Sequence, residues 1–191
     1  IIVSLVGSEM CIRDSMSSRK TLNITKATQK DAAILSKLSV AAFLPAHGHS
    51  ASKEIIDAYI AANFSEENFK AELSNPKFQY HLLYYKDAIA GFSKIAFNTE
   101  NRHIKAKNSS KMERLYLLEE FYNLGLGKEL MHFNIALAKQ HKQASIWLFV
   151  WVENTKAIAF YKKTGFKNVG AHDFVLSPTK TNPNHVLSLE F

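Results

Sequence analysis

The sequence predicts an α+β fold of mixed α/β character, with helices on both faces of one central sheet. Two observations predict it. Some segments show β-rich apolar alternation, whereas others repeat apolar residues at helical spacing. The two kinds of segment follow one another in the order β-α-α-α-β-β-β-α-β-α-β-β, so neither type forms a separate half. With 191 residues, 47% of them hydrophobic and 21% charged, the chain is large enough for one globular domain with a full core.

The N-terminal part is predicted to be one strand followed by three helices. Pro45 is expected just beyond the end of the first helix. Ser52 and Ser65 are suitable N-caps for the second and third helices, and Asn75-Pro76 ends the third. The strand is expected at 21–25 and the helices at 28–43, 52–64 and 65–73.

The rest of the chain alternates strands with two further helices. Lys86-Asp87 is a candidate two-residue hairpin turn between the first two of these strands. Asn154 opens the last helix and Gly165 closes it at the C′ position. Strands are expected at 77–85, 88–97, 111–118, 144–152, 168–176 and 185–191, helices at 128–142 and 154–166, and polar loops at 98–110 and 177–184.

The first fifteen residues are expected to lie outside the domain. The apolar run Ile1–Val6 has no preceding positive charge, and it is too short for a signal peptide or for a membrane span of about 20 residues. A buried N-terminal strand is a further interpretation. However, Leu5–Asp14 resembles the in-frame translation of a sequencing adapter, and Met16 resembles a start. We therefore predict a non-native extension over 1–15, a single domain over 20–191 and a cytoplasmic protein.

Two kinds of site are not expected. The only cysteine, Cys11, lies in the excluded segment, which argues against a disulfide, a cysteine nucleophile or a cysteine-based zinc site. His47 and His49 are the only close pair of histidines, and with no carboxylate nearby they are predicted to be surface residues of a turn. No metal site is therefore predicted.

The charge balance suggests an anionic partner. Twenty-four Lys and Arg outnumber 17 Asp and Glu, which gives a formal net charge of +7. Such a balance suits nucleic acid or a phosphate-rich cofactor. The basic residues are dispersed without a run of five, so no nucleic-acid-binding arm is expected.

A glycine-rich turn is the clearest candidate for a phosphate site. Gly125-Leu126-Gly127-Lys128 lies between a predicted strand and a predicted helix. Glycines allow close approach to the backbone, and a helix N-terminus offers unpaired N–H groups and a positive dipole end. The turn lacks the complete P-loop and dinucleotide-binding patterns, so a plain tight turn remains an alternative.

The combination of this turn with its surroundings is more informative. LYLLEEFYNLGLGKEL, a strand, and then VENTKAIAFYKKTGF together resemble the acetyl-CoA-binding motifs of the GCN5-related N-acetyltransferase (GNAT) superfamily. Within it, the C-terminal half is most similar to the PaiA-type spermidine/spermine N-acetyltransferases, and segment 50–97 agrees more loosely. The resemblance implies a splayed strand whose free backbone pairs with pantetheine, and a turn that holds the pyrophosphate. Tyr122 departs from the Gln or Arg usual at its position. The residues implied to bind acetyl-CoA are Leu115, Leu117, Tyr122, Asn123, Leu124, Gly125, Leu126, Gly127, Lys128, Asn154 and Lys163.

Two catalytic residues are also implied. Tyr161 matches the family's general-acid tyrosine, and a phenol of pKa about 10 suits protonation of a leaving thiolate. Glu113, on the strand before the turn, is the candidate base, directly or through a water. The alternatives are a packing tyrosine and a surface ion pair.

The resemblance implies direct acetyl transfer to a small primary amine, with a polyamine such as spermidine or spermine as the preferred acceptor. A protein of charge +7 does not attract a polycation, so a local acidic patch is required, with Asp57, Glu66, Glu67 and Glu72 as its candidates. A protein N-terminus or an aminoacyl-tRNA is an alternative acceptor, and a non-catalytic acetyl-CoA-binding module is a second alternative. A homodimer is expected by analogy only.

Overall fold

The computed structural model describes residues 22–191, so the expected extension over 1–15 lies outside the described residues. Seven strands form one sheet in the order β1-β2-β3-β4-β5-β7-β6. All neighbouring strands are antiparallel except β4 and β5, which run parallel. The strands are β1 Leu22–Lys26, β2 Phe78–Tyr85, β3 Ala88–Ala96, β4 Ser109–Leu117, β5 Ser145–Trp151, β6 Lys167–Ser177 and β7 Lys180–Glu190.

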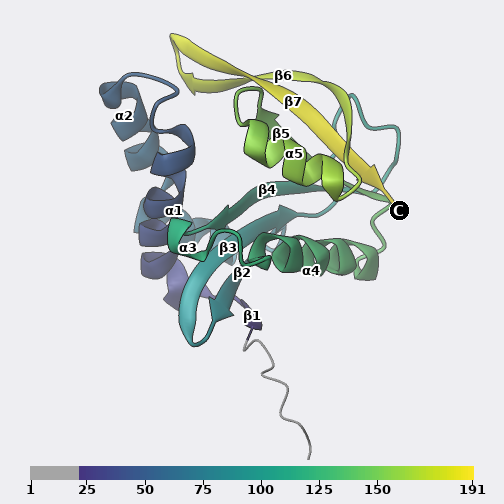
Figure 1. The fold of residues 1–191 in the computed structure, drawn as a ribbon, viewed down its shortest axis with the longest axis horizontal. Helices are drawn as coiled ribbons and strands as arrows, with labels where there is room; N and C mark the ends of the chain where they lie inside the picture. Colours follow the sequence, from purple (N-terminus) through teal and green to yellow (C-terminus); the bar gives the residue numbers. More distant parts are fainter. Residues whose placement is uncertain (1–21) are drawn as a thin grey trace, which may run out of the picture.

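Helices cover both faces of the sheet, as predicted. On β2, Tyr80 and Leu82 join the core under the first three helices, whereas Leu83, from the opposite side of the strand, packs with Leu126 and Leu130 of α4. The alternation of strand side chains explains this division. Figure 1 shows α1, α2 and α3 stacked on one side of the molecule, and the β6–β7 hairpin arching over α5. The α-helices are α1 Ala32–His47, α2 Lys53–Asn63, α3 Glu66–Ser74, α4 Leu126–Gln140 and α5 Thr155–Lys163, and the 3₁₀-helices are η1 Gln29–Asp31 and η2 Glu119–Phe121.

Several predicted helix ends and turns are confirmed. The Ser65 hydroxyl caps α3 by accepting a hydrogen bond from the backbone N–H of Asn68 at 3.2 Å. Lys86 and Asp87 both have positive φ, 48° and 65°, as a two-residue hairpin turn requires. Gly165 follows α5 with a φ of 100°.

The expected end of the first helix is wrong. Pro45 lies inside α1, which continues to His47. A proline removes one backbone N–H near a helix end, but it leaves its own carbonyl and the preceding carbonyl free to accept. The backbone N–H of Gly48 donates to the Leu44 carbonyl at 2.8 Å, so the last turn closes after the proline.

The predicted loop over 177–184 is also wrong, because most of it belongs to β7. Only Pro178 and Thr179 separate β6 from β7. Pro183 lies inside the strand, opposite Asp173 of β6. Its carbonyl accepts from the N–H of Val152, just past the end of β5. The N–H that proline lacks would point to this same side, just past the end of β5, so its absence does not interrupt the ladder between β5 and β7.

No helix within residues 22–191 is long and apolar enough to cross a membrane.

Candidate active site

The site is created by the separation of the two parallel strands. β4 and β5 pair only from Ser109–Lys111 to Ser145–Trp147. Beyond these residues β4 stays paired with β3 as far as Leu117, and β5 stays paired with β7 as far as Trp151. The strands therefore diverge, and one edge of β4 loses its neighbouring strand. This is the splayed arrangement that the sequence motifs imply.

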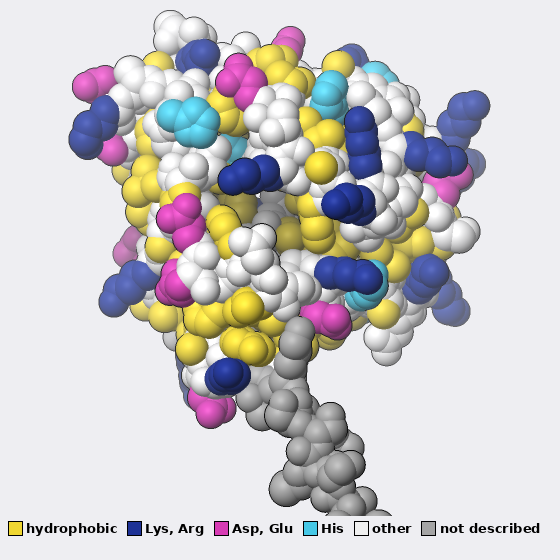
Figure 2. Space-filling view, in the orientation of Figure 1, with side chains coloured by type: hydrophobic (Ala, Val, Ile, Leu, Met, Phe, Trp, Pro, Cys, Tyr) yellow, Lys and Arg dark blue, Asp and Glu magenta, His cyan; other side chains and the backbone are white. Residues whose placement is uncertain are grey.

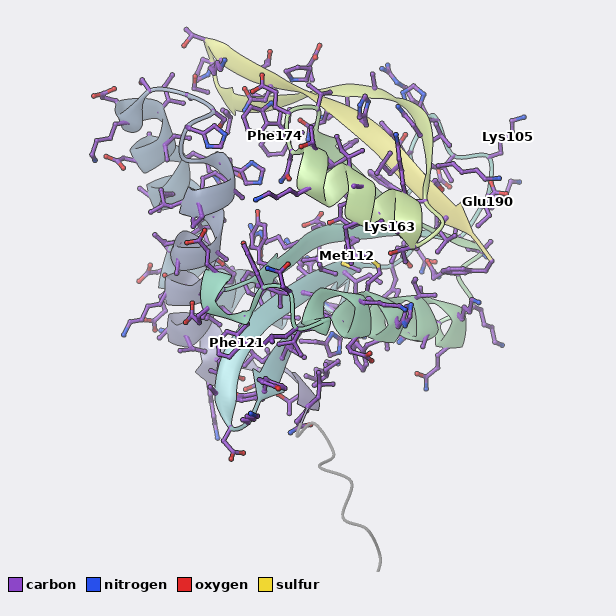
Figure 3. The ribbon with its side chains drawn as sticks, in the orientation of Figure 1. Lys105, Met112, Phe121, Lys163, Phe174 and Glu190 are labelled. Atoms are coloured by element: carbon purple, nitrogen blue, oxygen red, sulfur yellow. The ribbon has the colours of Figure 1, made fainter. Side chains whose placement is uncertain are left out.

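A cleft of about 1030 Å³ opens where the strands diverge. It is lined by Met112–Leu117 of β4, by Leu148–Trp151 of β5, and by the N-terminal ends of α4 and α5. Figure 2 shows this face hollowed near its centre, with hydrophobic side chains inside and several Lys or Arg side chains around the rim. In Figure 3, Phe174 of β6 and Phe121 of η2, both cleft-lining residues, lie on opposite sides of the opening.

The glycine-rich turn lies at one end of the cleft. Tyr122, Asn123, Gly125 and Lys128 all line the cleft, whereas Leu124 is 39% exposed and does not. Gly125 has a φ of 79° and caps α4. A Cβ built on Gly125 would meet no atom within 4 Å, so the turn presents an open cradle. Leu126 and Gly127 begin α4, and their N–H groups have no acceptor within the helix.

Leu115 and Leu117 of β4 both lie along the open edge of the cleft. Backbone groups on such an edge can pair with the amides of an extended ligand. The edge and the cradle therefore fit a pantetheine chain followed by a pyrophosphate, with Lys128 and Lys156 as cations in the cleft wall.

The two predicted binding residues of α5 are separated by the length of the helix. Asn154 lines the cleft and caps α5, because its side-chain oxygen accepts from the N–H of Ala157 at 3.1 Å. Lys163 is exposed at the opposite end of α5, and it is not among the cleft-lining residues (Figure 3). The structure therefore brings Asn154 to the cleft but does not bring Lys163 there.

Tyr161 also lines the cleft, from the last turn of α5. Its ring packs between Phe160 and Phe166, with ring centroids 5.2 Å and 5.7 Å away. Burial raises the pKa of Tyr161 to about 12, because the phenolate is poorly solvated there. The hydroxyl is thus protonated at neutral pH and can donate a proton.

Glu113 lies at a β-bulge of β4. Lys94 of β3 pairs with Arg114, and the next residue, Ile95, pairs with Met112, so Glu113 is the extra residue. One carboxylate oxygen lies 2.6 Å from the Lys94 ammonium, and the other lies 3.4 Å from that of Lys111. Burial acts to raise the pKa of Glu113, but the two lysines outweigh burial and hold the pKa below its ordinary value.

The ion pairs extend to α3. Glu72 lies 2.8 Å from Lys94 and 3.6 Å from Arg114, and it accepts a hydrogen bond from the Tyr80 hydroxyl. The Lys94 side chain is only 3% exposed, so this lysine joins Glu72 and Glu113 inside the protein. The sequence analysis missed Lys94; the signal for it was a lysine inside the apolar run of β3.

The predicted acidic patch does not form at the cleft. Of its four candidate residues only Glu72 lines the cleft, and Glu72 is already paired. Asp57 pairs with Lys53, and Glu66 lies 2.6 Å from Lys70, both on exposed helix surfaces.

The prediction of surface histidines in a turn is wrong for His47. It is the last residue of α1, it is half-buried, and its ring lies 5.0 Å from that of Phe43 and 6.1 Å from that of Trp151. His47 and His49 both line the cleft. Within residues 22–191, no three His, Cys, Asp or Glu side chains are grouped to hold a metal ion.

A sheet opened between parallel strands, a helix N-terminus facing the opening and a protonated tyrosine define a site for transfer from a phosphate-tailed donor. The chain belongs to the acetyltransferase (GNAT) family, whose model matches residues 44–166. It is therefore a GNAT-type, acetyl-CoA-dependent N-acetyltransferase.

The similar proteins agree with this assignment. An uncharacterized N-acetyltransferase of Lactobacillus delbrueckii subsp. lactis is 26% identical over 155 residues, which cover 81% of this chain and 90% of that protein. The spermine/spermidine N(1)-acetyltransferase of Bacillus subtilis is 29% identical over 93 residues, which cover 48% of this chain and 61% of that protein. The crystal structure of PaiA N-acetyltransferase from Thermoplasma acidophilum in complex with coenzyme A superposes with a TM-score of 0.71 at 19% identity. It covers 90% of this chain and 99% of that one, and this likeness supports the fold.

Proposed function

We propose that the chain transfers the acetyl group of acetyl-CoA directly to a small primary amine in the cleft between β4 and β5. One observation carries the proposal. Tyr161, protonated at neutral pH, lines the same cleft as the open edge of β4 and the N-terminus of α4. A binding surface for the donor and a proton source thus meet in one place.

The residues have separate roles in this proposal. Leu115 and Leu117 offer backbone groups to the pantetheine chain, and the α4 N-terminus at Gly125 and Leu126 offers N–H groups to the pyrophosphate. When bound, acetyl-CoA supplies a thioester whose carbonyl carbon is the electrophile. No residue of the cleft wall is a cysteine, and no covalent enzyme intermediate is required.

The transfer balances with one proton donor. The amine nitrogen forms a bond to the acetyl carbon, and the bond from that carbon to sulfur breaks. The Tyr161 hydroxyl donates its proton to the leaving sulfur, and the proton lost by the amine nitrogen passes through water to restore the phenol. Removal of Tyr161 therefore slows product formation without removing the donor-binding surface.

Glu113 is proposed to act as an anion rather than as a strong base. An efficient general base has a pKa near the working pH, whereas Lys94 and Lys111 hold that of Glu113 below its ordinary value. The amine then enters the reaction as its neutral form.

kcat/KM should rise with pH along the titration of the acceptor amine itself. For two acceptors whose amine pKa values differ, the plots of kcat/KM against pH should be displaced by that difference. The same plot for both acceptors would show that a group of the enzyme titrates instead.

A polyamine acceptor is supported by the partial match to the Bacillus subtilis enzyme. The missing acidic patch at the cleft weighs against it, because each further ammonium group of a polyamine needs an unpaired carboxylate.

The direct route is tested by mass spectrometry of protein and small molecules in the same reaction. With acetyl-CoA alone, the intact mass of the full chain should remain unchanged. After addition of primary amines, N-acetylated amine should accumulate in equal amount to free CoA. An acetylated protein that forms first and then disappears on amine addition would contradict direct transfer.

A further inference from the structure

Part of the cleft is lined by aromatic rings. They come from α1, the turn that follows it, α2, β5 and β6, and we call them the aromatic wall: Phe43, His47, His49, Tyr59, Trp151 and Phe174. The Phe43 and Tyr59 rings stack with centroids 5.3 Å apart, and the Phe174 ring meets Tyr59 edge-on at 6.1 Å. On the other side, His49 lies 5.3 Å from Trp151. The wall is thus continuous across the cleft.

The charges at the cleft do not favour a cationic acceptor. Glu72 and Glu113 are held by Lys94, Lys111 and Arg114, so two carboxylates face three cations. His47 adds no charge at neutral pH, because burial and the neighbouring His49 lower its pKa to about 4. The other carboxylates of the lining are Glu119, in η2 before the glycine-rich turn, and Glu153, between Trp151 of the wall and α5. Lys128 and Lys156 line the same cleft, so cations outnumber carboxylates there.

We infer that the acceptor is a primary amine whose non-reacting part is an aromatic ring. The aromatic wall supplies stacking and edge contacts to such a ring. The inference rests on the proposed acetyl transfer and names its acceptor class. It also fits the pairing of Glu72 and Glu113 with cations, because an aromatic amine has one nitrogen to react and no further ammonium group to bind.

The test compares acceptors at saturating acetyl-CoA with the full chain. The acceptors are phenethylamine, tyramine, butylamine and spermidine, and the readout is kcat/KM from CoA release. Phenethylamine should exceed butylamine and spermidine by about tenfold or more, because only the ring can use the aromatic wall. Spermidine at or above phenethylamine would overturn the inference and leave acetyl transfer intact. CoA release with none of the amines would overturn the proposed function together with the inference.

Two variants connect the preference to the wall. Phe174→Leu should lower kcat/KM for phenethylamine about threefold more than it lowers kcat/KM for butylamine. Phe191→Leu, at an exposed phenylalanine that does not line the cleft, is the matched control and should change neither. An equal fall for all acceptors in Phe174→Leu would contradict the inference, because it would reflect general damage.

Discussion

Burial changes the acidity of Tyr161. A phenol whose pKa is raised to about 12 keeps its proton throughout the neutral range. The hydroxyl is therefore present in the form that can donate, and the raised pKa makes it a weaker acid than a free phenol of pKa about 10. The same hydrophobic contacts with Phe160 and Phe166 that raise the pKa also fix the ring.

Replacement of Tyr161 by Phe should lower kcat by about 100-fold, because the proton donor is lost while the ring remains. The dissociation constant of acetyl-CoA, measured by calorimetry, should stay within about twofold of wild type. Tyr84→Phe, at a tyrosine of β2 that does not line the cleft, provides the control. Full activity in Tyr161→Phe would show that another group protonates the sulfur.

Lys94 is a second residue whose role depends on its surroundings, because its buried ion pairs contribute to the stability of the protein. Its buried ammonium joins two carboxylates, so Lys94→Met leaves Glu72 and Glu113 with fewer cationic partners inside the protein. The free energy of unfolding in urea at neutral pH should fall by about 3 kcal/mol. Lys70→Met removes an exposed pair with Glu66 and should cost less than about 0.5 kcal/mol.

The Lys94 effect should depend on pH with a definite sign. The pKa of Glu113 in the folded protein lies below its ordinary value of 4.5. The stabilisation is therefore complete above that value and is lost as the pH falls through the folded pKa. Equal losses in Lys94→Met and Lys70→Met at neutral pH would contradict the buried network.

The glycine-rich turn before α4 positions the first backbone N–H groups of that helix at the cleft. Its positive φ at Gly125 turns the chain from η2 into the helix, and the first N–H groups of α4 face the cleft. Such a turn is local in sequence, so glycine spacing made it a candidate, and the motifs around it in the sequence distinguished it from a plain tight turn.

Gly125→Ala should raise KM for acetyl-CoA about tenfold, because the new methyl group would enter the cradle at the helix N-terminus. Gly165→Ala is a matched control, since Gly165 also has a positive φ but lies at the far end of α5. Both variants should lose about 1 kcal/mol of stability from backbone strain. Steady-state kinetics and urea unfolding separate the two effects, and an unchanged KM in Gly125→Ala would contradict the cradle.

Features of helices and strands that depend on neighbouring residues could be predicted from the sequence, whereas features that depend on contacts between distant segments could not. The caps at Ser65 and Asn154 depend on a few neighbouring residues and were predictable. Pro183 could not be placed in a strand, because its tolerance depends on where β5 ends. Likewise, the Lys94–Glu113 contact arises from a bulge between two strands, and sequence spacing does not report such a register shift.

The free energy of unfolding of the whole molecule should fall in mild acid, because two of its histidines are buried. Burial and the nearby Lys26 lower the pKa of His81 to about 4, and that of His47 is also about 4. Unfolded histidine has a pKa of 6.5, so the unfolded chain binds more protons between these values. Stability should be complete above about pH 6.5 and fall toward about pH 4, by about 3 kcal/mol for His81.

Urea unfolding at a series of pH values measures this loss. His81→Leu should flatten the curve between about pH 6.5 and about pH 5. A wild-type curve already flat in this range would show that the histidines are not buried as neutral groups.

The distribution of the site along the chain decides which parts of it could be predicted from the sequence. The proposed acetyl-CoA half comes from one continuous stretch, from β4 through α5, and its motifs were recognisable there. The proposed acceptor half combines α1, α2, β5, β6 and β7, which are distant in sequence. Its aromatic wall therefore appears only in three dimensions.

The most direct test of the central claim is the initial rate of CoA thiol release from acetyl-CoA by the full chain, measured as primary amine is added. We expect a rate that is negligible without amine and rises hyperbolically with amine concentration, with N-acetylated amine formed in equal amount to CoA. Acetyl-CoA that binds but releases no thiol at any amine concentration, or releases it equally without amine, would contradict the account.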